Sequence, residues 1–165
     1  MPGKELSMKV EQLMSQPVRT CSVSDTLDRA ARLMWEHDVG CIIVESSGRV
    51  DGIITDRDIC MAGRFAGKPL WEIPVSEVMS RPAETVHPND PIETAERLMR
   101  TRRVRRLPVV NDSNALVGLL SIDDLARGAG VYRHEVEKSA EQVAETLAEV
   151  SAPTGSTTDL SWELW

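Results

Sequence analysis

Two short polar motifs carry the side chains whose types and spacing could do chemistry. They are Thr55-x-x-Asp58 and Ser121-x-x-Asp124, and in each a strand is predicted to end and a helix to begin at the hydroxyl residue. The first turn of a helix presents free N–H groups and the positive end of the helix dipole, which suit a phosphate. The hydroxyl can bond a ribose or phosphate oxygen, and the carboxylate one turn later can accept both hydrogens of a ribose diol.

The same spacing also has a structural explanation. Ser/Thr-x-x-Asp/Glu resembles a capping box, and a helix needs a cap whether or not a ligand binds. The residues inside the motifs differ, because Arg57 could reach a phosphate whereas Asp123 at the aligned position would repel one. We therefore expect two sites that are not equivalent, with the first favoured for a phosphorylated ligand.

The two motifs belong to an internal repeat. Residues 10–17 (VEQLMSQP) reappear as residues 75–82 (VSEVMSRP), an offset of 75 − 10 = 65. After a one-residue difference in a loop, residues 52–59 match residues 118–125 at an offset of 118 − 52 = 66. Matches that continue in order along both copies indicate a duplicated unit.

Each copy predicts the same order of elements. A short helix stops at the proline, an extended segment follows, and then comes a helix with one apolar face, for which Ser24 and Asn89 are the predicted N-caps. Two strands joined by a turn and a final helix complete the copy. The predicted strands are residues 20–21, 41–44 and 50–54 in the first copy, and 85–86, 107–110 and 116–120 in the second.

Such a unit cannot bury both of its apolar faces alone. We therefore expect an α+β fold, in which two β-α-β-β-α repeats pack sheet to sheet with pseudo-two-fold symmetry and leave a cleft between them. A C-terminal helix and tail follow. The predicted boundaries are residues 8–66 for the first repeat, 67–130 for the second, 131–150 for the C-terminal helix, and 151–165 for a linker and apolar tail.

The C-terminal helix carries a narrow apolar seam at spacings of three and four residues. The seam needs a partner, which is either the flank of the same chain or the same helix of a second subunit. In the tail, Trp162 and Trp165 suggest a docking segment that covers an apolar groove; the alternative is a disordered end. The seam consists of Val136, Ala140, Val143, Leu147 and Val150.

The repeated motifs resemble those of the cystathionine-β-synthase (CBS) domain, and the tandem pair resembles a Bateman module. The resemblance covers about residues 8–128, with two departures: Ile43 stands where the family often has the proline found at Pro108, and Ser121 replaces the threonine of the first copy. The motifs that carry it are Val10-x-x-Leu-Met14, Asp25-x-Leu27, Leu33-Met34, Val39-Gly40, residues 52–59, and their partners in the second copy, with Leu107–Val110 equally typical.

The resemblance implies a sensor of an adenosyl ligand, commonly AMP, ADP, ATP or S-adenosylmethionine, and usually a homodimer. It assigns ribose binding to Asp58 and Asp124. It also implies that the two sites are lined by a threonine of each extended segment and by an aliphatic residue beside the base. These are Thr20 and Thr85, and Ile53 and Leu119.

An arginine cluster over residues 97–106 has three interpretations: a phosphate-binding lip, a nucleic-acid patch, or a solvated helix C-terminus. The last does not account for Arg105 and Arg106, so one of them is kept as a ligand contact facing the cleft. His87 could approach a phosphate there, or is simply exposed. The complete set of predicted ligand-binding residues is Thr20, Ile53, Thr55, Arg57, Asp58, Thr85, His87, Arg105, Arg106, Leu119, Ser121 and Asp124.

Composition limits the possible classes of function. A net charge of −7 disfavours nucleic-acid binding, and three cysteines without a CxxC fit a reducing compartment. The sequence has no 18-residue apolar run and no signal-peptide core. It also has no Walker A loop, nucleophile elbow or cluster of metal ligands. We therefore expect a cytoplasmic protein that is not an enzyme and has no membrane, metal or catalytic site.

The leading hypothesis is a regulatory module that binds an adenosyl compound between the repeats and transmits binding as a conformational change. The alternative is a ligand-free dimerisation or interaction scaffold. No cofactor is required; the regulatory ligand is an adenine nucleotide, with or without Mg²⁺, or S-adenosylmethionine. The expected partners are a second copy of the chain and an unidentified regulated protein.

Overall fold

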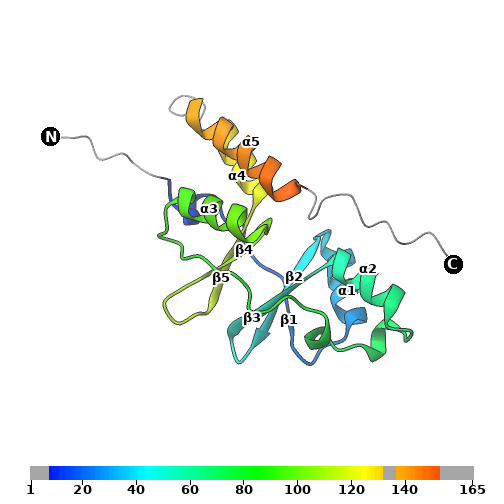
Figure 1. Cartoon of the computed structure of the whole chain (residues 1–165). Coiled ribbons are helices and arrows are strands. Elements are labelled where there is room, and N and C mark those ends of the chain that lie inside the picture. Colours follow the sequence, from blue (N-terminus) through cyan, green and yellow to red (C-terminus); the bar gives the residue numbers. More distant parts are fainter. Residues whose placement is uncertain (1–7, 132–136, 153–165) are drawn as a thin grey trace, which may run out of the picture.

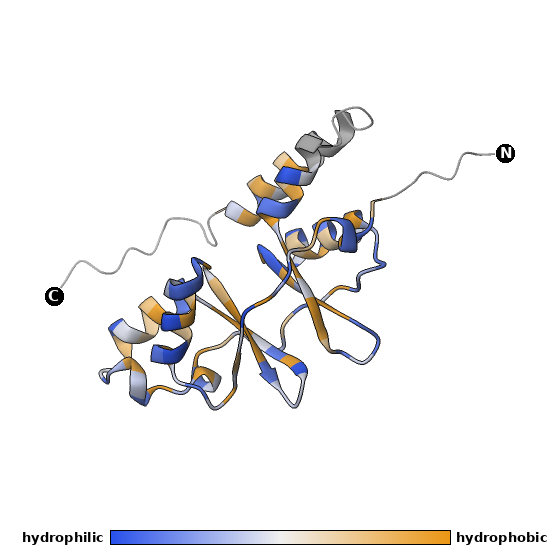
Figure 2. Ribbon diagram, turned by 180° about the vertical axis from the view of Figure 1, so that it is seen from behind, coloured by the Kyte–Doolittle hydropathy of each residue, from blue (hydrophilic) through white to orange (hydrophobic). Residues whose placement is uncertain are grey.

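The computed structural model describes residues 8–131 and 137–152 of the 165-residue chain. It has the predicted α+β architecture, in which two small sheets meet near the middle of the molecule and each carries its own helices (Figure 1). The strands are mostly apolar, whereas the helices have an apolar and a polar side (Figure 2). Within the described residues no helix is long and apolar enough to cross a membrane.

The first copy follows the predicted order. Its leading 3-10 turn and its strands and helices lie where the hydrophobic pattern indicated, and the last helix starts directly after Thr55. The elements are η1 (Val10–Gln12), β1 (Thr20–Ser22), α1 (Leu27–His37), β2 (Cys41–Ser46), β3 (Arg49–Thr55), α2 (Asp56–Phe65) and, in the connection, η2 (Leu70–Glu72).

The second copy repeats this order with one weaker strand. Val86 forms a single parallel bridge to Val109 where β1 pairs with β2 through Cys21 and Val44 in the first copy. Its sheet is therefore β4-β5, against β1-β2-β3 in the first copy. The elements are η3 (Val75–Glu77), α3 (Ile92–Arg102), β4 (Arg106–Val110), β5 (Leu116–Ser121), α4 (Ile122–Val131) and α5 (Glu137–Ser151).

The two copies exchange their first segments. Val10 is fully buried in the hydrophobic cluster of the second copy, whereas Val75 and Met79 are buried in that of the first. The backbone follows the same exchange, because Ser15 pairs with Leu119 of β5 (N–O 2.8 and 3.1 Å) and its repeat partner pairs with β3. The clusters therefore do not follow the sequence repeats.

Close backbone approach explains a glycine in each of the strands β3 and β5. A Cβ atom on Gly52 would lie 2.8 Å from both the Met79 sulfur and the Ser80 carbonyl oxygen. A Cβ atom on Gly118 would lie 2.5 Å from the Met14 sulfur. Each glycine thus makes room for the segment that the other copy contributes.

The predicted N-caps of the first long helix in each copy were wrong. Thr26 caps α1 and accepts from Arg29 N (3.4 Å), and Pro91 precedes α3. The turns before these helices are held instead by aspartates, because Asp25 accepts from Ser22 N and Asp90 accepts from His87 N, both at 2.8 Å. These turns delay the helix starts past Ser24 and Asn89.

The partner of the C-terminal helix is the chain's own flank. α5 packs against α3 and α4, with Val143 buried in the second hydrophobic cluster. Arg100 of α3 donates to the buried Thr146 hydroxyl (3.4 Å) and pairs with Glu149 (4.0 Å). Val136, the Ala140 side chain and the apolar tail lie outside the described residues.

Candidate functional site

Both polar motifs form capping boxes, as their spacing predicted. The Thr55 hydroxyl accepts from Asp58 N (3.3 Å), and Asp58 Oδ2 accepts from Thr55 N (2.8 Å) and from its hydroxyl (2.7 Å). In the second copy, Asp124 Oδ2 accepts from Ser121 N (2.8 Å) and from its hydroxyl (2.6 Å) in the same way. One oxygen of each carboxylate is therefore committed to the helix start.

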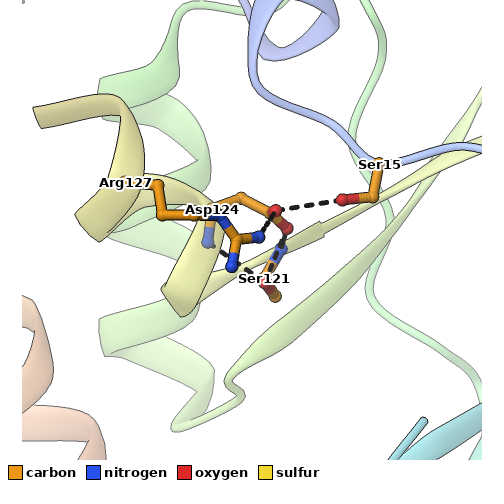
Figure 3. A network of polar contacts seen from close by, with 4 residues as sticks. All are labelled: Ser15, Ser121, Asp124 and Arg127. Atoms are coloured by element: carbon orange, nitrogen blue, oxygen red, sulfur yellow. Dashed lines mark hydrogen bonds and ion pairs between the residues drawn. The ribbon is translucent and has the colours of Figure 1, made fainter. Parts of the chain in front are cut away.

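The partners of the other carboxylate oxygen differ between the two copies. Asp124 Oδ1 accepts from the Ser15 hydroxyl (3.0 Å) and forms an ion pair with Arg127, which lies one turn along α4 (Figure 3). Asp124 is 6% exposed, whereas the Arg127 side chain is 70% exposed. None of the described residues donates to Asp58 Oδ1: the position aligned with Arg127 is Met61, and the Ser80 hydroxyl, aligned with that of Ser15, makes no bond to Asp58.

A cavity of about 430 Å³ lies beside Asp124 and is walled by both copies. Its volume is within the usual range of small-molecule sites, about 300–1,000 Å³. Three arginines, three aspartates and a histidine are among the residues that line it. The lining comprises Ser15, Pro17, Val18, Arg19, His37, Asp38, Val39, Gly40, Cys41, Arg106, Leu119, Ser121, Asp123, Asp124 and Arg127.

Arg106 crosses from β4 to the first copy. Its Nη2 would lie 3.2 Å from a Cβ atom on Gly40, so the missing side chain leaves room for the guanidinium. Cys41, the next residue, is buried, and this burial raises the pKa of its thiol; Arg106 acts in the opposite direction and Asp56 adds to the rise. Arg106 thus supplies positive charge at the junction of the copies.

Four of the predicted ligand-binding residues line this cavity: Arg106, Leu119, Ser121 and Asp124. Thr20 lines a different cavity of about 620 Å³ together with Gln16, Pro17, Val18, Glu45, Leu116 and Val117. The remaining predicted residues line neither of these cavities nor the one of about 660 Å³ between α1 and α2. They are Ile53, Thr55, Arg57, Asp58, Thr85, His87 and Arg105.

Two of those residues lie away from the cavity in identifiable settings. His87 Nδ1 is 3.6 Å from Asp112 Oδ1, and Arg105 is exposed while its carbonyl accepts from Ile122 N (3.0 Å). Conversely, the sequence interpretation missed Arg19 and Arg127. Arg127 could have been found, since three residues after Asp124 is the same face of a helix.

The fold is that of a pair of CBS domains. The CBS domain family model matches residues 10–64 and 75–129, so the chain belongs to this family. The CBS domain-containing protein YhcV of Bacillus subtilis is 42% identical over 117 residues, which are 71% of this chain and 82% of that relative.

Two further relatives show different settings of such a pair. The crystal structure of the CBS domain pair of protein MJ0100, in complex with 5′-methylthioadenosine and S-adenosyl-L-methionine, has a TM-score of 0.68 and 26% identity; the match covers 75% of this chain and 97% of that one. Homoserine O-acetyltransferase of Methanohalophilus mahii is 34% identical over 74% of this chain, but the match covers 25% of that protein.

Proposed function

We propose that this chain is a regulatory module that binds an adenosyl compound, such as AMP, ADP, ATP or S-adenosylmethionine, in the cavity beside Asp124. The observation that carries the proposal is the cavity of about 430 Å³ walled by both copies, with the Ser121–Asp124 motif on one side and residues 37–41 on the other. The structural similarity to an MJ0100 domain pair that holds two adenosyl compounds supports it.

Each wall of the cavity has a role in this proposal. Asp124 accepts the ribose hydroxyls through Oδ1, which requires Arg127 to leave its ion pair; Leu119 lies beside the base. The freed Arg127, together with Arg19 and Arg106, then faces the phosphates or the carboxylate of the ligand. The exposed Arg127 side chain can make this change at low cost.

A second, weaker or different site around Asp58 is part of the proposal. There Thr55 and Arg57 face the ligand, with Thr85 and Ile53 beside it. His87 and Arg105, which lie away from the cavity beside Asp124, have a role only if a ligand at this second site reaches them. We predict that a phosphorylated ligand prefers this site around Asp58, although the cavity of about 430 Å³ lies beside Asp124.

Signal transmission follows from how the cavity is built. Because a ligand touches both copies, it stabilises the arrangement in which both walls reach it. The first turn of α4 carries Asp124, and α5 packs on α4, so a shift of that turn moves the C-terminal helix. We propose that a homodimer in the cytoplasm uses this movement to regulate another protein, without catalysis and without a required cofactor.

The test is calorimetric titration of the full chain with AMP, ADP, ATP, S-adenosylmethionine and NAD, with and without Mg²⁺. We expect at least one to bind. Asp124→Asn keeps an acceptor for the cap but removes the charge, and should weaken that binding about tenfold or more, since a hydrogen bond to a charged group contributes ~1.5–3 kcal/mol. Asp112→Asn, at an exposed position, is the matched control. Binding of none of the five compounds would exclude the adenosyl proposal.

A ligand-free interaction scaffold is the second candidate, and one observation favours it. Both capping boxes are complete without any ligand, so Asp58 and Asp124 have a structural role already. The scaffold predicts that Asp58→Asn and Asp124→Asn leave self-association unchanged in sedimentation experiments, and that none of the five compounds alters it. The sensor predicts that the bound compound changes it.

A further inference from the structure

Arg106 is a half-buried cation at the junction of the two copies. It lines the cavity beside Asp124, and its guanidinium forms no hydrogen bond or ion pair within the part of the chain that the structure describes. Arg127 lines the same cavity but is paired with Asp124. Because a half-buried charge is only partly solvated, the Arg106 guanidinium is available to an anion.

The strand pairing directs Arg106 toward the Ser121–Asp124 motif. Arg106 of β4 pairs with Ser121 of β5, so their side chains lie on the same face of the sheet. Both residues line the cavity, and α4 begins at the next residue, Ile122. An anion in this part of the cavity would therefore meet a guanidinium, a hydroxyl and the positive end of a helix.

A carboxylate of the first copy lies close to this guanidinium. A Cβ atom on Gly40 would lie 3.2 Å from Arg106 Nη2 and 3.6 Å from Asp56 Oδ2. The two charged atoms are therefore no further apart than the sum of these distances, although no ion pair joins them. Asp56 Oδ1 accepts from Arg57 N (2.8 Å), so Oδ2 is the oxygen that remains for Arg106.

Gly40 separates the two charges without a side chain of its own. It lines both the cavity beside Asp124 and the cavity of about 660 Å³ between α1 and α2, whereas Arg106 lines only the former and Asp56 only the latter. Both charges act on the Cys41 thiol: burial raises its pKa, Arg106 lowers it and Asp56 raises it further. The two side chains therefore interact electrostatically across Gly40.

The fold does not require this charged pair, because the equivalent pair is uncharged. The repeat aligns Arg106 with Cys41 (106 − 65 = 41) and Asp56 with Ile122 (122 − 66 = 56). Cys41 and Ile122 are both buried. The same junction is thus built once with two opposite charges and once without them, and the charged version borders the cavity beside Asp124.

We propose that Asp56 is a positioning residue for Arg106. In the free chain the carboxylate draws the guanidinium toward the first copy, and a phosphate or carboxylate of the ligand draws it into the cavity instead. The cavity therefore distinguishes adenosyl compounds that carry an anion from those that do not, and only the former loosen this contact between the copies. The inference rests on the proposed function, since it concerns a ligand of the same cavity.

The experiment is a double-substitution cycle, read by calorimetric titration of the full chain with AMP and with adenosine. Arg106→Met should lower the AMP affinity about tenfold or more, the effect of a lost charge-assisted hydrogen bond, and leave adenosine unchanged. Asp56→Asn should raise the AMP affinity about threefold, since it removes a competing but exposed charge. With both substitutions, the AMP affinity should equal that of Arg106→Met alone.

Two results of this cycle would overturn the proposal. A gain from Asp56→Asn that persists alongside Arg106→Met would show that Asp56 acts on the ligand directly, and no gain in either background would show that it does not act. Arg106→Lys keeps the charge, should retain part of the gain, and serves if Arg106→Met misfolds. Asp28→Asn and Arg32→Met, at an exposed ion pair of α1 (3.2 Å), are the matched controls and should leave both affinities unchanged.

Inorganic phosphate separates failure of this proposal from failure of the proposed function. Phosphate should raise the melting temperature of Asp56→Asn more, and that of Arg106→Met less, than that of the unaltered chain. If no adenosyl compound binds but phosphate gives this pattern, the proposed function fails and the role of Asp56 stands. If AMP binds and neither substitution alters its affinity, the role of Asp56 fails and the proposed function stands. Absence of both AMP binding and the phosphate pattern would overturn both.

Discussion

The two copies share one cap and differ in what surrounds it. In both, a hydroxyl and a carboxylate close the first turn of the last helix. In the second copy, Asp124 also holds Ser15 and Arg127, whereas in the first Met61 replaces the arginine and Asp58 Oδ1 faces no donor among the described residues. Duplication has thus kept the structural role of the motif, while residues one turn away set the charge that a ligand would meet.

The outer helix faces of the two copies also have different surroundings. The second copy buries its outer face under α5, and the first leaves Trp35 exposed. At one repeat position the first copy presents the exposed aromatic Trp35, whereas the second presents Arg100, which bonds to α5. The copies are related by sequence and fold, but the residues around equivalent positions differ. Substitutions that give one copy the residue of the other can test this difference.

The largest expected effect concerns the exchanged segments. Gly52→Ala places a Cβ atom against the Ser80 carbonyl, which is backbone, whereas Gly118→Ala meets only the flexible Met14 side chain. We expect unfolding free energies to fall by about 2–3 kcal/mol for the former and about 1 kcal/mol for the latter. Urea denaturation measures both. Gly63→Ala, whose nearest neighbour would be an ordinary 3.6 Å contact, is the control and should not destabilise. Equal losses at both strands would show that the two approaches are equally tight.

The next largest effect concerns the residue that holds α5 on the outer face of the second copy. Arg100→Trp gives the second copy the residue of the first and removes the bonds to Thr146 and Glu149. We expect a loss of about 1–2 kcal/mol, because the hydrogen bond to Thr146 and the ion pair with Glu149 are both removed. Hydrogen exchange over residues 137–151 should accelerate, whereas Arg97→Ala on the exposed side of α3 should leave it unchanged. Unaltered exchange would mean that apolar packing alone holds α5.

A third substitution makes the site beside Asp124 resemble the one around Asp58, and its expected effect rests on the proposed function. Arg127→Met removes both the ion pair with Asp124 and a phosphate contact. Adenosine should bind more tightly, because Arg127 no longer competes with its ribose for Asp124. AMP should lose the contact between its phosphate and Arg127. We expect the ratio of AMP to adenosine affinity to fall about tenfold, or ~1.4 kcal/mol. Calorimetry with both compounds tests this. An unchanged ratio would remove Arg127 from the site, and Arg64→Met, on the outer helix α2, controls for the lost charge.

The smallest effect is a pH dependence that only the second copy carries. Glu96 is buried at the position of Ala31 (96 − 65 = 31), and burial raises its pKa above the ordinary 4.5, with Arg100 opposing and Glu93 adding. Because the folded pKa is the higher one, stability falls as pH rises from about 4.5 through that raised value. Glu96→Gln should flatten this part of the melting-temperature profile, and the exposed Glu36→Gln should not. A profile unchanged by Glu96→Gln would assign the dependence to other groups.

Much of this fold was predictable because the repeat shows the sequence pattern of each helix and strand twice. The strands around Ile42 and Leu120 and the helix starts at Thr55 and Ser121 follow directly from hydrophobic runs and cap spacing. The exchange of first segments was not predictable, because Val10 and Val75 are the same residue type at equivalent positions of the repeat. A duplicated sequence does not indicate which of the two hydrophobic clusters each first segment joins.

The site was predicted in part for a similar reason. The motif residues Ser121 and Asp124 reach the cavity, but motif spacing says nothing about residues brought from the other copy, such as Arg19 and His37. Asp123 seemed to disfavour a phosphate at this site when considered alone. In three dimensions Arg19 and Arg106, which lie far from Asp123 in the sequence, line the same cavity, so Asp123 alone does not set the charge that a phosphate would meet.

The exchange of first segments also determines the order in which the two hydrophobic clusters can form while the chain is being synthesised. The first copy draws on residues up to Met79, all of which leave the ribosome in one continuous stretch, so its core can close early. The second copy needs Val10, whose amide donates to the Asp90 carbonyl (3.0 Å), a contact that spans 90 − 10 = 80 residues. The segment made first is therefore buried last, and it must stay unpaired until the second half of the chain has been made.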